Sequence, residues 1–219
     1  MKRIAFACWS IVGLGTAPST QAQGTFQNLD FEQAQISTPP PGGGPVSQLL
    51  PHWQASENGV TATQIAYDTI ALTKWAVTIQ DVNGEGSLSG KYSVFLQGGK
   101  DPVNPGYAEI SQIGTMATDT HSILFAASMT RPGNLNVAFN GQQLQTALLQ
   151  DHSTYQTFGA DVSAFAGQTG ELSFTAPDPT WTLIDNIQFS TAIIPEPTES
   201  ALILFGAIAL AGCIGKRRI

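Results

Sequence analysis

The chain has 219 residues, of which 42% are hydrophobic and only 11% charged, and its formal net charge is −7 at pH 7. Such an acidic chain is a poor partner for nucleic acid and for anionic lipid surfaces, because both carry negative charge. The middle of the chain, about 170 residues, is long enough for one domain with a sizeable core.

The N-terminal residues have the pattern of a segment that directs export. Lys2 and Arg3 form a positively charged start, and the residues from Ile4 to Leu14 are mostly apolar. Small residues in Thr20-Gln21-Ala22 stand where a signal peptidase reads its substrate. We therefore predict a signal peptide over residues 1–22, cleaved by signal peptidase.

Cysteine usage and charge restrict what the exported body can do. Both cysteines, Cys8 and Cys213, lie in the apolar terminal segments, so a disulfide, a thiolate nucleophile and a cysteine metal site are excluded from the body. The body has four basic residues against fourteen acidic ones, a formal charge near −10. Neutral glycans and divalent cations are suitable partners for such a surface, whereas nucleic acid is not.

The body has the pattern of a β protein. Its apolar residues alternate or form short runs, these runs are separated by Gly, Pro, Asn and Asp, and no segment has a convincing helical period. Asn140-Gly141 is the strongest hairpin turn in the chain. We therefore predict an all-β fold, an antiparallel β-sandwich that forms one domain over residues 23–192. The predicted strands cover residues 74–79, 92–96, 121–129, 135–139, 172–174 and 183–189.

The C-terminal residues have the pattern of a membrane anchor. The run from Ser200 to Gly215 has no charged residue, and as a helix it spans roughly 24 Å at a rise of about 1.5 Å per residue. Lys216, Arg217 and Arg218 follow it directly, and they can cover the shortfall against the hydrocarbon core of about 30 Å. We predict a transmembrane helix over residues 200–215, with the basic tail on the cytoplasmic side and the body outside.

The order of three parts in residues 193–219 is specific. Pro195-Glu196-Pro197 comes first, then the apolar run, then the basic tail at 216–218. This arrangement resembles the PEP-CTERM sorting signal of Gram-negative bacteria. The resemblance implies that an exosortase, a membrane transpeptidase-like enzyme, recognises the tripeptide. It also implies that the body crosses the inner membrane, stays anchored by its C-terminus, and is then released to the cell surface or the extracellular polysaccharide matrix.

Short motifs mark the body from its start to its end. They are Asn28-Leu29-Asp30-Phe31-Glu32, Pro51-His52-Trp53, Ala108-Glu109-Ile110-Ser111-Gln112, Val137-Ala138-Phe139-Asn140-Gly141 and Leu183-Ile184-Asp185-Asn186-Ile187. Their order and spacing resemble those of the galactose-binding-like jelly rolls, which include many carbohydrate-binding modules. The chain departs from that pattern at Leu29, His52 and Ile184. The resemblance implies a jelly-roll sandwich.

The same resemblance implies a structural calcium ion between the first and last strands, held by Glu32 and Asp185. Strand alternation gives separate support, because Asp185 is in register with Leu183, Ile187 and Phe189 and is expected to point toward the core. A buried carboxylate is costly unless it is paired or bound to an ion, and its oxygens suit Ca²⁺. The alternative is that Asp185 accepts hydrogen bonds from backbone amides near a sheet edge, without a metal. The sequence leaves both open.

Aromatic residues are the candidates for contact with a sugar, because sugar rings stack on aromatic faces while polar neighbours fix their hydroxyl groups. Trp53 matches a position that is usually in the core of the family. Trp75 lies in a predicted strand, Tyr107 follows a loop, and Trp181 lies in the loop that enters the last strand. We therefore name Tyr107, Trp181 and Trp75 as candidate ligand-binding residues, with packing as the alternative role of each. Tyr155 is a further aromatic candidate in the body.

The sequence contains none of the common catalytic motifs. The three histidines are scattered, and there is no nucleophile elbow, Walker loop or dinucleotide fingerprint. We predict a non-catalytic, exported protein of the cell surface or exopolysaccharide matrix whose β-sandwich binds carbohydrate. A structural or adhesive matrix protein with no defined small ligand is the alternative. A secreted glycan-active enzyme is a remote alternative, since fourteen carboxylates always allow some acid pair.

Overall fold

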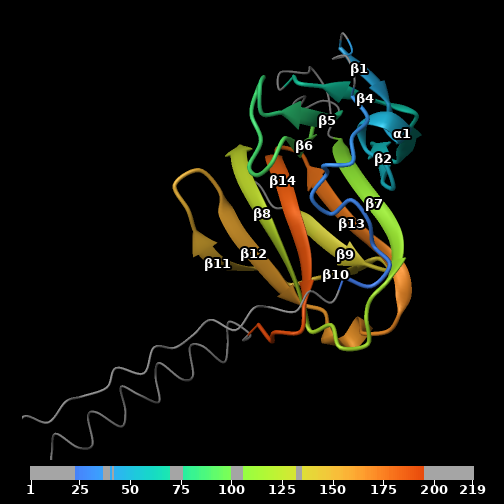
Figure 1. The fold of residues 1–219 in the computed structure, drawn as a ribbon, viewed down its shortest axis with the longest axis vertical. Helices are drawn as coiled ribbons and strands as arrows, with labels where there is room; N and C mark the ends of the chain where they lie inside the picture. Colours follow the sequence, from blue (N-terminus) through green and yellow to red (C-terminus); the bar gives the residue numbers. More distant parts are fainter. Residues whose placement is uncertain are drawn as a thin grey trace, which may run out of the picture.

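The computed structural model describes residues 23–36, 40, 42–69, 76–99, 106–131 and 135–194 (Figure 1). The predicted signal peptide, Trp75, the Pro195-Glu196-Pro197 motif, the apolar run and the basic tail all lie outside the described residues. Within the described part of the chain, no helix is long and apolar enough to cross a membrane.

Short strands dominate the described chain, and they form two sheets. The elements are β1 (Gly43–Pro45), α1 (Val46–Leu49), β2 (Gln54–Glu57), β3 (Val60–Ala62), β4 (Gln64–Tyr67), β5 (Ala76–Asp81), β6 (Tyr92–Gln97), β7 (Tyr107–Thr115), β8 (Ser122–Arg131), β9 (Asn136–Phe139), β10 (Gln142–Gln143), β11 (Ala147–Asp151), β12 (Gln156–Asp161), η1 (Ser163–Phe165), β13 (Thr169–Pro177) and β14 (Trp181–Ser190). One sheet has eight strands in the order β1-β4-β5-β6-β14-β8-β12-β11. The other has six strands in the order β10-β9-β13-β7-β2-β3.

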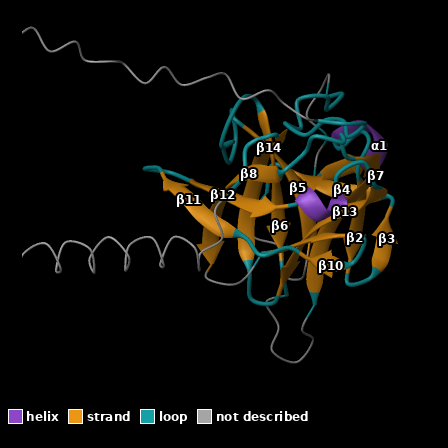
Figure 2. Cartoon of the chain, turned by 90° about the horizontal axis from the view of Figure 1, so that it is seen from below, coloured by secondary structure: helices purple, strands orange, loops and turns teal. Residues whose placement is uncertain are grey.

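The topology is that of a jelly-roll sandwich. From β6 onward the chain crosses repeatedly between the two sheets, so that β6, β8, β12 and β14 lie in one layer and β7, β9 and β13 in the other (Figure 2). Described strand pairs are antiparallel except for the short parallel pair of β4 and β5. The predicted antiparallel β-sandwich of the jelly-roll type is therefore confirmed.

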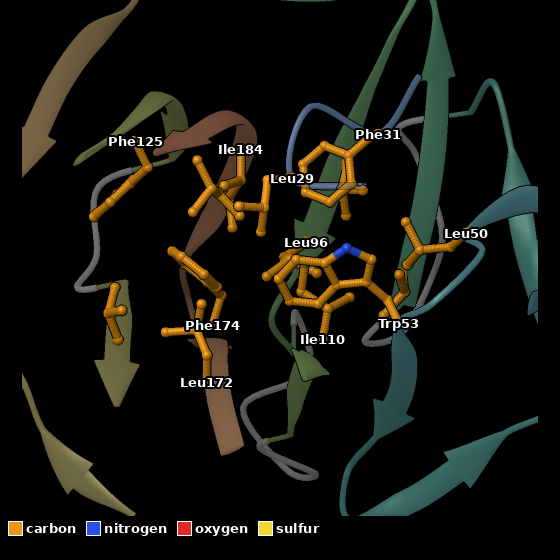
Figure 3. Close-up of a cluster of buried hydrophobic side chains, with 14 of the residues drawn as sticks. Leu29, Phe31, Leu50, Trp53, Leu96, Ile110, Phe125, Leu172, Phe174 and Ile184 are labelled. Atoms are coloured by element: carbon orange, nitrogen blue, oxygen red, sulfur yellow. The ribbon is translucent and has the colours of Figure 1, made fainter. Parts of the chain in front are cut away.

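Apolar side chains from the facing sides of both sheets form one core (Figure 3). Trp53 is buried there, with ring centroids 5.7 Å from Phe31 and 6.3 Å from Phe174. Its indole Nε1 donates a hydrogen bond to the carbonyl oxygen of Asn28 at 2.9 Å, which fixes the ring and satisfies its polar atom. Trp53 is thus a core residue, as its place in the second motif predicted.

Side-chain amides fasten the N-terminal segment of the body to the sandwich. Gln112 of β7 accepts a hydrogen bond from the backbone N–H of Gln27 at 2.7 Å and donates one to its carbonyl oxygen at 2.9 Å. Asn28 donates to the carbonyl oxygen of Pro51 at 2.9 Å and accepts from the backbone N–H of Gln33 at 3.0 Å. Each amide supplies one donor and one acceptor to backbone groups that no strand satisfies. These contacts hold the first motif, which includes Glu32, against the sandwich.

Candidate functional site

The carboxylate of Glu32 holds the turn that precedes β6. Its Oε1 accepts hydrogen bonds from the backbone N–H groups of Lys91 at 2.7 Å and Tyr92 at 3.0 Å. Gly90 has a φ of +59°, and a Cβ added there would lie 2.3 Å from Oε1 of Glu32. Glycine adopts this left-handed conformation without strain, and it leaves room for the carboxylate of Glu32 beside the backbone.

Asp185 holds the same turn from β14. Its Oδ2 accepts hydrogen bonds from the backbone N–H of Ser89 at 2.9 Å and from the hydroxyl of Ser93 at 2.7 Å. Its Oδ1 accepts from the backbone N–H of Asn186 at 2.6 Å. The first and fifth motifs, more than 150 residues apart in the chain, therefore converge on residues 89–93.

The prediction that Asp185 points into the core with Leu183 is wrong in one respect. Leu183 lies outside the core, whereas Ile184 and Ile187 lie in it. The register of β14 with β8 shifts between Asp185 and Gln188, and Asn186 in this bulge has a φ of 51°. A bulge adds one residue and so exchanges the two faces of a strand. Asp185 is fully buried, at 0% exposure, but on the opposite side of β14 from Ile184.

Burial of the Asp185 carboxyl raises its pKa to about 7. Hydrogen bonds from Ser93, Asn186 and Ser89 oppose the rise, and the negative charge of Glu32 adds to it. The cost of this charge in the folded state is what a bound cation would relieve. The oxygen atoms of the two carboxylates suit calcium. In the structure, however, Asp185 accepts hydrogen bonds from N–H and O–H groups, as in the alternative without a metal.

A calcium ion at this place would need oxygen ligands in addition to those of the acidic side chains. Among the described residues, no three or more His, Cys, Asp or Glu side chains are arranged to hold a metal ion. Backbone carbonyl or hydroxyl oxygens of the turn would have to complete the coordination of an ion at Glu32 and Asp185. The calcium ion therefore stays a prediction. The Oδ1 of Asp30 accepts a weak hydrogen bond from the backbone N–H of Glu32 at 3.4 Å, so Asp30 is a local turn residue in the structure.

The side of the eight-stranded sheet that faces away from the core, here called the outer face, carries a second set of polar and aromatic residues. Because Val77, Val94, Leu96 and Ile184 point into the core, the alternate residues of β5, β6 and β14 point outward. Strand register places these residues in cross-strand rows. The rows are Ala76, Gln97 and Trp181; then Thr78, Phe95, Leu183 and Ser128; then Gln80 and Ser93, beside Asp185.

Trp181 is a half-buried aromatic at one end of the outer face. Its Nε1 donates to the carbonyl oxygen of Gly98 at 3.2 Å. Its ring meets the ring of Phe95 edge to face, with centroids 6.2 Å apart and planes at 83°. These two contacts fix the orientation of the indole.

Two polar atoms lie on the outward side of β5, where the sheet is covered, because every residue of β5 and β6 is buried. Thr78 and Gln80 are fully buried, and within the described chain neither Thr78 Oγ1 nor Gln80 Oε1 has a hydrogen-bond partner. Gln80 Nε2 donates to the carbonyl oxygen of Thr69 at 2.9 Å, which fixes the direction of its amide. Buried polar atoms normally find a protein or water partner, so these two mark a place for an ordered water.

A cavity of about 230 Å³ lies beside the outer face, at the turn between β11 and β12. His152 and Tyr155 stack there, with ring centroids 4.3 Å apart and planes at 26°. Ser128, which pairs with Leu183 in the second row, also lines the cavity. Aromatic surface, hydroxyl groups and the carboxylate of Asp151 therefore surround one opening. This cavity was not among the predicted sites, because it forms only when the hairpin pairs with β8.

The structure separates the predicted aromatic residues. Tyr107 begins β7 of the six-stranded sheet, and its neighbour Ala108 is in the core, so Tyr107 is on the far side of the sandwich from Trp181. Its hydroxyl lies 3.0 Å from where a Cβ on Gly59 would be. Tyr107 and Trp181 therefore lie on the outward sides of different sheets, and Trp75 lies outside the described residues.

The outward side of the six-stranded sheet has a different character. Ser111 pairs with Ser173, and the hydroxyl of Thr175 donates to Oε2 of Glu109 at 2.7 Å. Small hydroxyl and carboxylate side chains thus cover the middle of this sheet, without the aromatic rows of the outer face.

No protein-family model matches the chain, and no curated protein matches it. The chain is similar to solved carbohydrate-binding modules. TmCBM61 in complex with β-1,4-galactotriose has 12% identity and a TM-score of 0.36, over 76% of this chain and 97% of that one. The family 11 module from Clostridium thermocellum, in complex with a β-1,3-1,4-mixed-linked tetrasaccharide, has 14% identity and a TM-score of 0.39, over 70% and 97%. The catalytic unit of a GH87 α-1,3-glucanase from Streptomyces thermodiastaticus has 17% identity and a TM-score of 0.36, over 64% and 26%.

Proposed function

We propose that the chain is an exported, non-catalytic protein whose sandwich binds a neutral carbohydrate at the outer face of the eight-stranded sheet. The observation that carries the proposal is the half-buried indole of Trp181, fixed by Gly98 and Phe95, on the side of the sheet where the half-buried Leu183 and Ser128 form the next row. A sugar ring packs its C–H face on such an indole, while amides and hydroxyls fix its hydroxyl groups. The cavity at His152 and Tyr155 extends this surface across β8.

Charge favours a neutral glycan. The body carries a formal charge near −10, and Asp151 lines the cavity, so a uronic acid or a sulfated sugar would be repelled. A carboxylate can instead accept two hydrogen bonds from the adjacent hydroxyl groups of an uncharged sugar.

The structural use of three of the body's fourteen carboxylates supports the non-catalytic assignment. Glu32 and Asp185 accept backbone and hydroxyl hydrogen bonds inside the fold, and Glu109 accepts one from Thr175. An acid pair for glycoside hydrolysis needs two carboxyl groups that face one substrate. The described contacts of these three residues give each a structural role.

The proposed place of action is the outside of a Gram-negative bacterium. The terminal segments of the sequence support it: residues 1–22 as a signal peptide, and residues 193–219 as an exosortase-recognised sorting signal with a transmembrane helix. The body would be anchored first and then displayed at the cell surface or in the extracellular polysaccharide matrix. A structural calcium ion at Glu32 and Asp185 belongs to the same proposal, because a cation would offset the buried negative charge.

A structural or adhesive matrix protein is the second candidate function. The small polar side chains in the middle of the outward side of the six-stranded sheet favour it, because this part of the sheet offers no aromatic surface for a sugar. The two candidates therefore differ in whether the outer face has a defined ligand.

A glycan-array screen of residues 23–194, run with calcium and again with chelator, tests the proposal. We expect saturable binding to a neutral glycan, and loss of binding in chelator would indicate that the ion supports the site. A folded sample that binds no glycan in either condition would leave the structural role.

A further inference from the structure

The outermost strand of the eight-stranded sheet exposes apolar side chains. Leu148 and Leu149 of β11 are 52% and 42% exposed, and Ile193, just after β14, is 73% exposed. β11 lies at one end of the molecule, with its outer edge free of further described strands (Figure 2). Leu148, Leu149 and Ile193 are called the edge patch below.

The end of the described chain is packed against this same strand. A Cβ added at Gly159 of β12 would lie 2.7 Å from Cδ1 of Leu149 and 2.4 Å from Cδ1 of Ile194. The side chains of Leu149 and Ile194 therefore meet over the bare backbone of Gly159, and Ile194 is only 8% exposed. The position where the chain leaves the sandwich is thus fastened beside the edge patch.

The remaining sequence limits how far the edge patch can be from a membrane. Five residues, Pro195–Glu199, separate Ile194 from Ser200, where the predicted transmembrane helix begins. A fully extended chain covers about 3.3–3.6 Å per residue, so this connection reaches about 20 Å at most. Whenever residues 200–215 are in a bilayer, the edge patch is held close to its surface.

We propose that the edge patch rests on the membrane interface while the protein is anchored, and that the bilayer is its partner. This inference rests on the anchoring in the proposed function. Anionic lipids would repel the acidic body, so the contact comes from burial of the three apolar side chains, helped by the high effective concentration that the tether imposes. Short apolar contacts of this kind bind weakly on their own and become significant beside a second anchor.

The contact would also orient the sugar-binding surface. β14 runs from Trp181, on the outer face, to Ser190, near the exit of the chain. At about 3.3 Å per residue the strand separates these ends by roughly 30 Å. With the edge patch on the bilayer, Trp181 would be at the end of β14 that is farther from the membrane, directed toward the matrix.

Fluorescence quenching from brominated lipid tests the proposal on the full chain in phosphatidylcholine vesicles. All chains carry Cys8→Ser. One keeps the native Cys213 as the labelled cysteine, and the others carry Cys213→Ser with either Leu148→Cys or Ile113→Cys. Ile113 is the matched control, because it is 69% exposed but lies on the six-stranded sheet.

We expect strong quenching at Cys213, and quenching at position 148 that exceeds that at position 113 several-fold. Adding Leu149→Gln and Ile193→Gln should reduce the quenching at position 148 to the level at position 113, and in the chain labelled at Cys213 it should leave the quenching unchanged.

If positions 148 and 113 are quenched equally while Cys213 is still quenched, the orientation is overturned but the anchoring is not. If Cys213 is not quenched, both the anchoring and the orientation are overturned. Shielding of position 148 that depends on protein concentration and not on lipid would assign the patch to a second copy of the chain, and would also overturn the proposal.

Discussion

Asp185→Asn should change the pH dependence of folding stability in a defined direction. Asp185 is fully buried, and its pKa is about 7 instead of 3.8. The folded protein therefore holds this proton more tightly than the unfolded chain does. The contribution of this group favours folding below pH 4 and is lost as the pH rises through about 7.

The size of the effect follows from the pKa. At about 1.4 kcal/mol for each pKa unit, the loss of stability between pH 4 and pH 8 is about 4 kcal/mol at most. Asparagine has nearly the same shape but no titrating carboxyl. Changed hydrogen bonds to Ser89 and Asn186 would shift the stability of the variant by a constant amount, without altering its slope against pH.

Urea unfolding of both proteins in chelator, at several pH values from about 4.5 to 8, measures the effect. The difference in unfolding free energy, wild type minus Asp185→Asn, should fall from about pH 4.5 to about pH 7 and level off above it. Gln142→Ala on the exposed strand β10 controls for nonspecific effects and should give a difference that does not vary with pH. A difference for Asp185→Asn that is constant, or that grows with pH, would refute the reasoning.

Three further predictions concern calcium and two other side-chain contacts of the fold. Calcium should raise the melting temperature of the wild type but not of Asp185→Asn or Glu32→Gln, and unchanged melting of the wild type would argue against the ion. Gln112→Ala removes both hydrogen bonds to Gln27 and should cost about 2 kcal/mol in urea unfolding, so a loss below about 0.5 kcal/mol would contradict the fastening role. Burial acts to raise the pKa of Asp81, but hydrogen bonds from Asn83 and Tyr67 outweigh it and hold the pKa below 3.8. Tyr67→Phe removes the 2.8 Å bond to Asp81, so an NMR titration should find the Asp81 pKa raised, and an unchanged value would count against this contact.

Much of the fold was predictable because alternation of apolar residues is a local signal. The runs at 76–81 and 92–97 are strands, and the motif residues Asn28, Trp53 and Gln112 have defined contacts in the structure. Their side chains complete the backbone hydrogen bonding of the N-terminal segment, which explains why an amide stands at positions 28 and 112. The jelly-roll resemblance implied that Glu32 and Asp185 share one ion, and in the structure both carboxylates hold the turn at residues 89–93.

Other features depend on long-range pairing, which alternation does not encode. The bulge at Asn186 exchanges the faces of β14, so counting from Phe189 put Asp185 and Leu183 on the wrong side. Tyr107 and Trp181 both lie near loops in the sequence, yet strand pairing places them on different sheets. The cavity at His152 needs the hairpin of β11 and β12 to pair with β8, and no local pattern marks that contact.

Calorimetric titration of Trp181→Ala and Tyr107→Ala with the glycan selected by the array tests the central claim most directly. Both substitutions remove one aromatic ring, but only Trp181 lies on the outer face of the eight-stranded sheet. We predict that Trp181→Ala weakens binding by at least about tenfold, whereas Tyr107→Ala stays within about twofold of the wild type. Circular dichroism confirms that both variants are folded. Full binding by Trp181→Ala, or loss of binding only in Tyr107→Ala, would contradict the assignment of the outer face as the glycan site.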